Sequence, residues 1–279
     1  MTTALLEHAQ AAIAKGSITE DSVRSPDGTR IGFRRLGSGP ALVMVHGSVS
    51  THTDWMRVAK LLSGHFCCYA IDRRGRSHSG AGASTYSIER EYEDIVAVLE
   101  AAGPGALLAG HSFGAICAMG AAMLHPVPRL VLYEPPLPVG GHIAGGYLAA
   151  YASSVAESDM DTALEIGLSK FTRLSAEAIA AMRVSRAWPR LRTLAPSWTR
   201  ELEAMDSRPA SVDHYRAIAC PVLLLKGSVS PEHPMQNAAR ALAQALPDVR
   251  VETLAGQGHM ALRGAPEMVA GLMLDFLAH

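Results

Sequence analysis

The sequence has no excess of charge of either sign, because 25 lysine and arginine residues are matched by 26 aspartate and glutamate residues in a chain of 279. A surface that binds nucleic-acid phosphates or an anionic membrane needs a clear excess of basic residues. We therefore expect neither nucleic acid nor a membrane as a partner of this chain.

Cysteine is scarce as well. The four cysteines lie at positions 67, 68, 117 and 220 and lack the paired spacing of a zinc site, so we expect buried, reduced thiols. An uninterrupted apolar core is missing from residues 1–16, which include Glu7. This segment is predicted to form a short amphipathic helix and not a signal peptide, which favours a cytoplasmic location.

Short runs rich in Val, Leu and Ala recur along the chain, separated by helical stretches. This alternation predicts an α/β fold, with a mostly parallel central β-sheet flanked by helices. Asp27-Gly28-Thr29 predicts a hairpin that opens the sheet with antiparallel strands. The predicted parallel strands span 41–46, 66–71, 106–110, 129–133, 221–226 and 250–254, and the predicted helices span 53–62, 87–102, 113–124, 234–246 and 265–278.

One connection, from Pro135 to Ala219, is far longer than the roughly dozen residues that a crossover needs. Helix-forming residues dominate at 160–174, 176–186 and 198–205, while prolines at 189, 196 and 209 are expected to break the runs. We interpret 135–219 as a helical cap over the carboxyl ends of the strands, entered through a hinge at 135–146. Residues 1–134 and 220–279 form the predicted core.

The segment Gly110-His111-Ser112-Phe113-Gly114 follows a predicted strand and precedes a predicted helix. This is the context of a nucleophile elbow, in which a serine sits on a strained strand-to-helix turn and flanking glycines prevent collisions. Ser112 is therefore the candidate nucleophile. The backbone N–H of Phe113, at the start of the helix, is a candidate donor for an oxyanion.

With this elbow, the chain resembles the α/β-hydrolase superfamily from about Asp27 to the carboxyl terminus, least clearly in the cap. The resemblance includes His46-Gly47, Asp72-Arg73-Arg74-Gly75-Arg76-Ser77 and Gly256-Gln257-Gly258-His259, all in the family's order. It implies that His259 is the base that activates Ser112. It also implies that the loop after His46-Gly47 supplies a second oxyanion donor, for which Ser48 is the first candidate and Val49 the next.

Other polar residues of these motifs receive structural interpretations. His111 is expected to pack or to form a hydrogen bond, and His46 to order the loop beside the site. The resemblance implies that the 72–77 loop braces the site, with its Asp and Arg residues pairing among themselves.

The chain departs from the family at the third member of the triad. In most relatives this residue is an Asp three positions after a Gly, and that position, counted from Gly227, is Ser230. A serine cannot stabilise an imidazolium by charge. Glu134, directly after the preceding strand, is the leading substitute, and Glu232 is the second option.

These residues favour a serine hydrolase that cleaves a carboxylic ester, lactone or thioester of a small apolar molecule through an acyl-enzyme. Two alternatives remain: acyl transfer, cyclisation or perhydrolysis from the same intermediate, and ligand binding with vestigial turnover. Neither a cofactor nor a metal is expected, and a homo-oligomer is possible. The pocket is expected to be mainly apolar, drawing on the large cap side chains, namely Tyr147, Tyr151, Phe171, Met182, Trp188 and Trp198.

Overall fold

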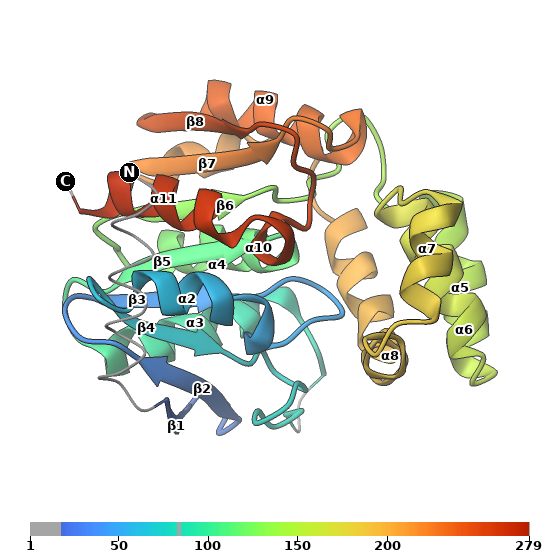
Figure 1. Cartoon of the computed structure of the whole chain (residues 1–279), viewed down its shortest axis with the longest axis horizontal. Helices are drawn as coiled ribbons and strands as arrows, with labels where there is room; N and C mark the ends of the chain where they lie inside the picture. Colours follow the sequence, from blue (N-terminus) through green and yellow to red (C-terminus); the bar gives the residue numbers. More distant parts are fainter. Residues whose placement is uncertain (1–17, 83–84, 279) are drawn as a thin grey trace.

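The computed structural model describes residues 18–82 and 85–278, so the helix predicted over residues 1–16 lies outside the described chain. The described residues form one eight-stranded sheet with the order β1-β2-β4-β3-β5-β6-β7-β8 (Figure 1). β1 pairs antiparallel with β2, and β2 pairs antiparallel with β4. All remaining neighbours are parallel. The α/β fold and its antiparallel opening hairpin are confirmed.

The strands are β1 Thr19–Arg24, β2 Arg30–Leu36, β3 Ala41–Val45, β4 Cys67–Ile71, β5 Leu107–His111, β6 Leu130–Tyr133, β7 Val222–Gly227 and β8 Val249–Leu254. Each predicted parallel strand is present within one residue at either end. The core helices are η1 His52–Asp54, α2 Met56–Leu62, α3 Ile88–Ala102, α4 Phe113–Leu124, η5 Glu232–Gln236, α9 Asn237–Ala245, α10 Ala261–Gly264 and α11 Pro266–Leu277.

Helices cover both faces of the sheet. On one face, buried residues of α2 and α11 join the core with alternate residues of β3 and β7. On the other face, α3, α4 and α9 bury their apolar side chains against the remaining alternate residues. Because successive side chains of a strand point to opposite faces, a strand covered on both faces is mostly apolar, as β5 is up to His111 and as β6 is along its whole length.

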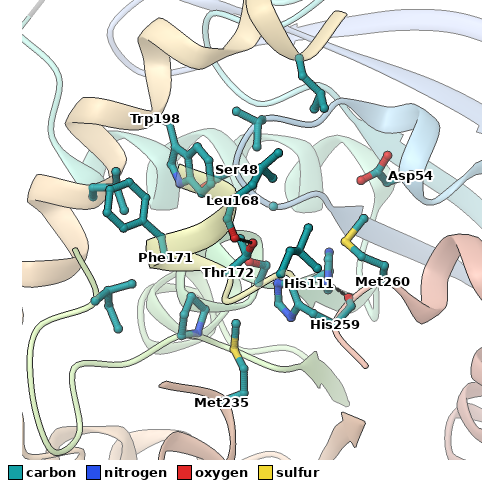
Figure 2. A pocket seen from close by; sticks show the side chains of 18 of the residues that line it. Ser48, Asp54, His111, Leu168, Phe171, Thr172, Trp198, Met235, His259 and Met260 are labelled. Atoms are coloured by element: carbon teal, nitrogen blue, oxygen red, sulfur yellow. Dashed lines mark hydrogen bonds between the residues drawn. The ribbon is translucent and has the colours of Figure 1, made fainter. Parts of the chain in front are cut away.

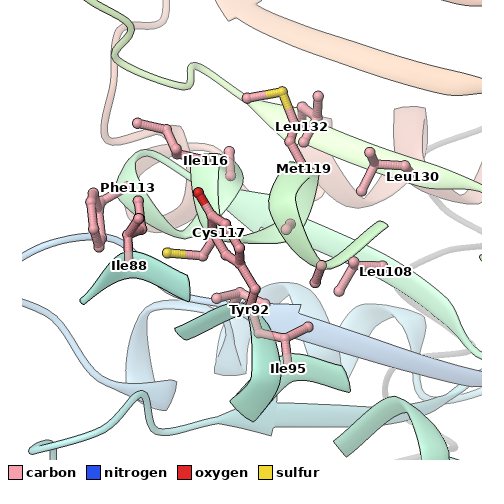
Figure 3. Packing of buried hydrophobic residues seen from close by; sticks show 14 of the residues in the cluster. Ile88, Tyr92, Ile95, Leu108, Phe113, Ile116, Cys117, Met119, Leu130 and Leu132 are labelled. Carbon is pink, nitrogen blue, oxygen red and sulfur yellow. The ribbon is translucent and has the colours of Figure 1, made fainter. Parts of the chain in front are cut away.

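The helix that follows Ser112 is held rigidly in this core. Figure 3 shows α3 residues such as Tyr92 and Ile95 lying among the apolar side chains of α4, including Cys117. A Cβ at Gly120 would lie 2.3 Å from Cζ of Tyr92, so only glycine lets the two helices approach this closely. The amino terminus of α4 is therefore fixed with respect to the sheet.

The long connection between β6 and β7 forms a helical insertion beyond the carboxyl ends of the parallel strands (Figure 1). It contains η2 Gly145–Tyr147, α5 Leu148–Ala156, α6 Met160–Ile166, η3 Gly167–Phe171, α7 Ala176–Arg183, α8 Trp188–Asp206 and η4 Asp213–Ala217. The predicted hinge contains no regular element before η2, and Asp206 at the end of α8 accepts hydrogen bonds from the backbone of Ile143, Ala144 and Gly145.

The expectation that prolines break the insertion at 189 and 196 is wrong. Pro189 lies in the first turn of α8, where its missing N–H costs nothing, and the helix continues through Pro196 to Asp206. A proline in a helix interior removes one hydrogen bond. Burial of the apolar face of α8, including Ala195 and Trp198, opposes that loss. Pro209 lies beyond the helix end, as expected.

Candidate active site

Ser112 occupies a strained turn between β5 and α4. Its φ is 55° and its ψ is −129°, a region that residues with a Cβ rarely adopt. A Cβ at Gly110 would lie 2.5 Å from the carbonyl oxygen of Gly114, and one at Gly114 would lie 2.4 Å from that of His46. Both flanking glycines are therefore required by close backbone contacts, as the elbow motif predicts.

His259 lies in the loop after β8, and two paired residues of the sheet hold this loop. His111 and Tyr133 are register partners on β5 and β6. His111 Nε2 lies 2.9 Å from the carbonyl oxygen of His259. The Tyr133 hydroxyl donates to the carbonyl of Gly258 and accepts from the N–H of Ala261. His111 thus forms a hydrogen bond, as expected, and the role of Tyr133 is one that the sequence did not indicate.

The contact made by His111 also fixes its ring protonation. Burial lowers the pKa of His111 well below its ordinary value, so the ring is neutral. A neutral imidazole that bonds to a carbonyl through Nε2 must carry its proton there. His111 therefore donates a neutral hydrogen bond to the loop that carries His259.

Glu134 reaches the same loop from the end of β6. Its side chain is fully buried and its φ is 45°. Oε1 accepts a hydrogen bond from the N–H of Gly227 at 2.6 Å, and Oε2 lies 2.8 Å from Nδ1 of His259. Since a carboxylate only accepts hydrogen bonds, the proton of His259 belongs on Nδ1, which leaves Nε2 free to act as a base.

The other candidate acid lies elsewhere. Glu232 is paired with Arg240, and the side chains of both are more than half exposed to solvent. Ser230, at the family's usual position for the acid, has a buried hydroxyl without a hydrogen-bond partner in the described chain. The structure thus brings Glu134 to His259 and leaves Glu232 on the surface.

The candidate oxyanion donors surround Ser112. The backbone N–H groups of Ser48, Val49 and Phe113 form no hydrogen bond within the described residues. A Cβ at Gly47 would lie 2.8 Å from Cβ of Ser112, so this loop touches the candidate nucleophile. Buried N–H groups are nearly always paired in proteins, and the free N–H of the fully buried Phe113 suits a site for a negatively charged oxygen.

The loop after β4 braces this region, although not in the expected way. Its charged residues do not pair with one another: Asp72 binds His52, Arg73 binds Glu91 and Glu201, Arg74 binds Asp27 and Asp94, and Arg76 binds Glu201. The loop therefore connects distant elements. His46 orders the neighbouring loop, since its Nδ1 lies 2.8 Å from the carbonyl oxygen of Gly47.

Ser112 and His259 line one cavity between the sheet and the insertion, with about 880 Å³ of space that includes open solvent. No hydrogen bond joins their side chains in the described structure; such catalytic contacts often shorten only when substrate binds. Figure 2 shows Phe171, Trp198 and Leu168 of the insertion on one side and the two histidines, His111 and His259, on the other. Of the cap side chains considered from sequence, Phe171, Met182 and Trp198 line the cavity, whereas Tyr147, Tyr151 and Trp188 do not.

An ion pair that no sequence motif indicated also lines the cavity. Arg263 of α10 donates to the buried carboxylate of Asp54, with Nε 3.0 Å from Oδ1. The pair connects η1, which follows the loop that carries Ser48, with α10, which follows the loop that carries His259. Because the two charges cancel, the cavity carries little net charge, and most of its remaining lining is apolar.

The described residues contain no group of three or more His, Cys, Asp or Glu side chains placed to hold a metal ion. None of the helices they form is both long and apolar enough to cross a bilayer.

Known proteins resemble this chain in sequence and architecture. The model of the alpha/beta hydrolase family matches residues 42–272. A 2-(acetamidomethylene)succinate hydrolase from Mesorhizobium japonicum is 28% identical over 255 residues, which cover 88% of this chain and 91% of that protein. An N-formylmaleamate deformylase from Pseudomonas putida is 34% identical over 129 residues, 45% of this chain and 46% of that protein. Among solved structures, an alpha/beta hydrolase from Sphaerobacter thermophilus superposes with a TM-score of 0.82 at 31% identity, covering 92% of this chain and 100% of that one.

Proposed function

The chain belongs to the alpha/beta hydrolase family, and from this premise we propose that it is a serine hydrolase that cleaves a carboxylic ester, lactone or thioester of a small apolar molecule. The observation that carries the proposal is the contact of 2.8 Å between Glu134 Oε2 and His259 Nδ1, beside the strained turn of Ser112. A buried carboxylate on one imidazole nitrogen is the arrangement that makes the other nitrogen a base for a serine.

In the proposed acylation step, His259 Nε2 removes the proton of Ser112 Oγ as the oxygen attacks the substrate carbonyl. The negative oxygen that forms is stabilised by the N–H of Phe113 and by that of Ser48 or Val49. Glu134 stabilises the imidazolium without taking its proton. The carbon–oxygen or carbon–sulfur bond then breaks, and His259 gives its proton to the leaving group.

In the proposed deacylation step, water replaces the alcohol or thiol. His259 removes a proton from the water as its oxygen attacks the acyl carbonyl, and the same donors stabilise the second oxyanion. The bond between the acyl carbon and Ser112 Oγ then breaks, His259 returns its proton to Oγ, and the carboxylic acid is released. The apolar lining contributed by Leu168, Phe171 and Trp198 suits a neutral acyl or alcohol group.

A second candidate reaction is hydrolysis of an N-acyl bond. It is favoured by the names of the two relatives, an acetamidomethylene compound hydrolase and a deformylase. The same Ser112 and His259 chemistry would apply, with an amine as the leaving group. Matched esters and amides of one apolar acid separate the two candidates by their kcat/KM values.

We expect Ser112→Ala to abolish labelling by a fluorophosphonate probe and to lower kcat by about 10⁴ to 10⁶, because residues of such a triad act as a unit. Labelling is measured by mass spectrometry of the intact protein, and turnover with a nitrophenyl ester. Ser230→Ala is the control and retains labelling. A probe adduct on another serine in Ser112→Ala would refute the assignment.

The nitrophenol time course tests the alternatives to hydrolysis. A pre-steady-state burst followed by sustained turnover supports an acyl-enzyme that water resolves, whereas a burst without turnover supports a binding protein. Product analysis with added alcohol or peroxide identifies acyl transfer or perhydrolysis. EDTA is expected to leave turnover unchanged, and loss of activity restored by zinc or magnesium would contradict the proposed mechanism.

A further inference from the structure

The carbonyl of Gly47 is bound on the side of the peptide that faces the protein interior. It accepts hydrogen bonds from Nδ1 of His46 at 2.8 Å and from Nη1 of Arg73 at 3.2 Å. His46 Nε2 in turn accepts from the backbone N–H of Arg73 at 3.1 Å, so the proton of this ring lies on Nδ1. Both acceptor positions of the Gly47 oxygen are therefore occupied.

This arrangement determines where the next N–H points. In a trans peptide the C=O and N–H bonds lie in one plane and point in opposite directions. The Gly47–Ser48 bond is not among the cis bonds of the described chain. With the Gly47 oxygen directed at Arg73 and His46, the N–H of Ser48 is directed away from them, and Gly47 and Ser48 line the cavity with Ser112.

Arg73 is held in place by contacts on every side. Its Nε and Nη2 donate to Glu91 of α3 at 3.1 and 3.0 Å, and Nη2 also donates to Glu201. Its guanidinium lies 4.6 Å from the ring centroid of Phe113, the residue that carries the other oxyanion candidate. One fully buried arginine thus touches both sides of the candidate oxyanion site.

Glu201 belongs to α8 of the insertion, not to the core. Its Oε1 accepts from both Arg73 and Arg76, and its side chain is fully buried. Although burial opposes ionisation, Arg73, Arg76 and the hydroxyl of Ser48 lower the pKa of Glu201 below its ordinary value. The helical insertion therefore places a charged carboxylate among Arg73 and Arg76, behind the Ser48 loop.

The same face of α8 lines the cavity. Trp198, Leu202 and Met205 contribute to the cavity wall, and Glu201 lies three residues after Trp198. Helical residues spaced by three, four and seven positions share one face. A displacement of α8 would therefore change the cavity wall and the support of Arg73 together.

We propose that Arg73 and Glu201 are positioning residues that hold the Gly47–Ser48 peptide with its N–H toward the cavity, so that oxyanion stabilisation depends on the docking of α8 against the core. The inference rests on the proposed serine hydrolase. It assigns to the helical insertion a role in the chemical step in addition to its contribution to the cavity wall.

Two variants test this role. Arg73→Lys keeps the charge and can pair with one carboxylate, but it cannot bind Gly47, Glu91 and Glu201 at once. Glu201→Gln keeps one acceptor and removes the charge that holds both arginines. We expect each variant to lower kcat with a nitrophenyl ester by about 10- to 100-fold, somewhat less than removal of an oxyanion donor, with KM within about threefold of the wild-type value.

Binding of a trifluoromethyl ketone provides a readout that a merely structural role would not change. This inhibitor adds to the serine as a hemiketal oxyanion, so its affinity should fall by the same factor as kcat/KM. Binding of the corresponding alcohol, which forms no oxyanion, should stay unchanged. Glu203→Gln is the matched control, because it removes a carboxylate from the solvent-exposed side of the same helix, α8.

The outcomes separate this inference from the proposed function. Complete fluorophosphonate labelling of Ser112 in both variants shows that the nucleophile is intact, and circular dichroism shows that they fold. Wild-type ketone affinity in folded Arg73→Lys would overturn the inference, as would an equal loss of affinity in Glu203→Gln. If Glu201→Gln fails to fold, Arg73→Lys decides the result alone, since it retains the balance of charge.

Discussion

The two oxygens of the Glu134 carboxylate have separate partners. One accepts from the N–H of Gly227 and the other from Nδ1 of His259, and the side chain is shielded from solvent. The Gly227 bond fixes the rotation of the carboxylate and so aims the second oxygen at the imidazole. A residue with one acceptor and one donor group cannot satisfy both partners, because both are N–H donors.

This geometry gives a direct prediction for Glu134→Gln. The amide NH₂ must face either the Gly227 N–H or the His259 N–H, so we expect the imidazole to lose its orientation while the fold persists. The value of kcat should fall by about 10² to 10⁴. Steady-state kinetics with a nitrophenyl ester, together with circular dichroism, would measure the effect.

Glu232→Gln is the matched control. Glu232 is paired with Arg240 at the surface, so its loss should leave kcat near the wild-type value. The reverse ranking of the two variants would move the acid to Glu232. Two variants with near-normal kcat would mean that a neutral group or a backbone carbonyl orients His259.

Asp54 determines the charge of the cavity, because it neutralises Arg263. In Asp54→Asn the guanidinium is uncompensated, so kcat/KM for the monoester anion of a dicarboxylic acid should rise about tenfold relative to a neutral ester of equal size. Arg57→Gln is the control, since Arg57 binds only the backbone carbonyl of Arg263. An unchanged preference would show that Arg263 does not contact the substrate, and faster turnover of the anion by the wild type would refute the expected preference for neutral substrates.

The residues of the candidate site differ in how clearly the sequence identifies them. Ser112, His259 and the oxyanion candidates belong to local motifs. Glu134 is identified as a candidate because the usual position of the acid is occupied by Ser230. Asp54 and Glu201 belong to no motif, and no motif indicates the hydrogen bonds of Tyr133. Their contacts join positions more than 120 residues apart, such as Tyr133 with Gly258 and Arg73 with Glu201, and only the folded chain brings them together.

At the scale of elements, the turn from β5 to α4 depends on backbone contacts that leave no room for a methyl group. A Cβ at Gly114 would lie 2.4 Å from the carbonyl oxygen of His46 and 2.5 Å from that of Val45. Both atoms belong to the loop that carries Ser48 or to the strand before it. A shift of α4 would therefore displace both candidate oxyanion donors.

Gly114→Ala is accordingly expected to lower the free energy of unfolding by about 1 to 3 kcal/mol, as overpacking of a rigid core does, and to reduce kcat. Gly64→Ala is the control, because a Cβ at Gly64 meets no atom within 4 Å. Urea titrations of both variants measure the difference. Equal stability of the two would show that the elbow can adjust its backbone without cost.

A helix or strand can be predicted from sequence where its local propensity and its packing in the fold favour the same structure. Strands β3 to β8 were predicted within one residue because their apolar runs satisfy both. The single helix α8 was not predicted, because proline has a low local preference for helix interiors. Burial of Ala195, Trp198 and Leu202 on one face of α8 outweighs that preference.

At the scale of the whole molecule, the fold encloses several ionisable groups in two different states. Arg73, Glu91 and Glu201 form a charged network with almost no exposed surface. His46, beside Arg73, and His111, beside His259, are neutral rings, and burial lowers the pKa of each well below its ordinary value. The folded state therefore resists protonation at two sites that the unfolded chain protonates freely.

These histidines predict a loss of stability in mild acid. Above about pH 7.5 both rings are neutral in either state and make no pH-dependent contribution, whereas below about pH 6.5 only the unfolded chain binds the two protons. The free energy of unfolding should thus fall with decreasing pH, with a limiting slope of about 2.7 kcal/mol per pH unit from the pair. Urea unfolding between pH 5 and pH 8 measures this slope.

His111→Gln, whose amide can still donate to the His259 carbonyl, should reduce the slope by about half. His125→Gln, a change at a partly exposed position, should leave the slope unchanged. A stability that stays constant from pH 7 to pH 5 would mean that the folded protein accepts protons at His46 and His111, which would contradict their assignment as neutral donors beside the site.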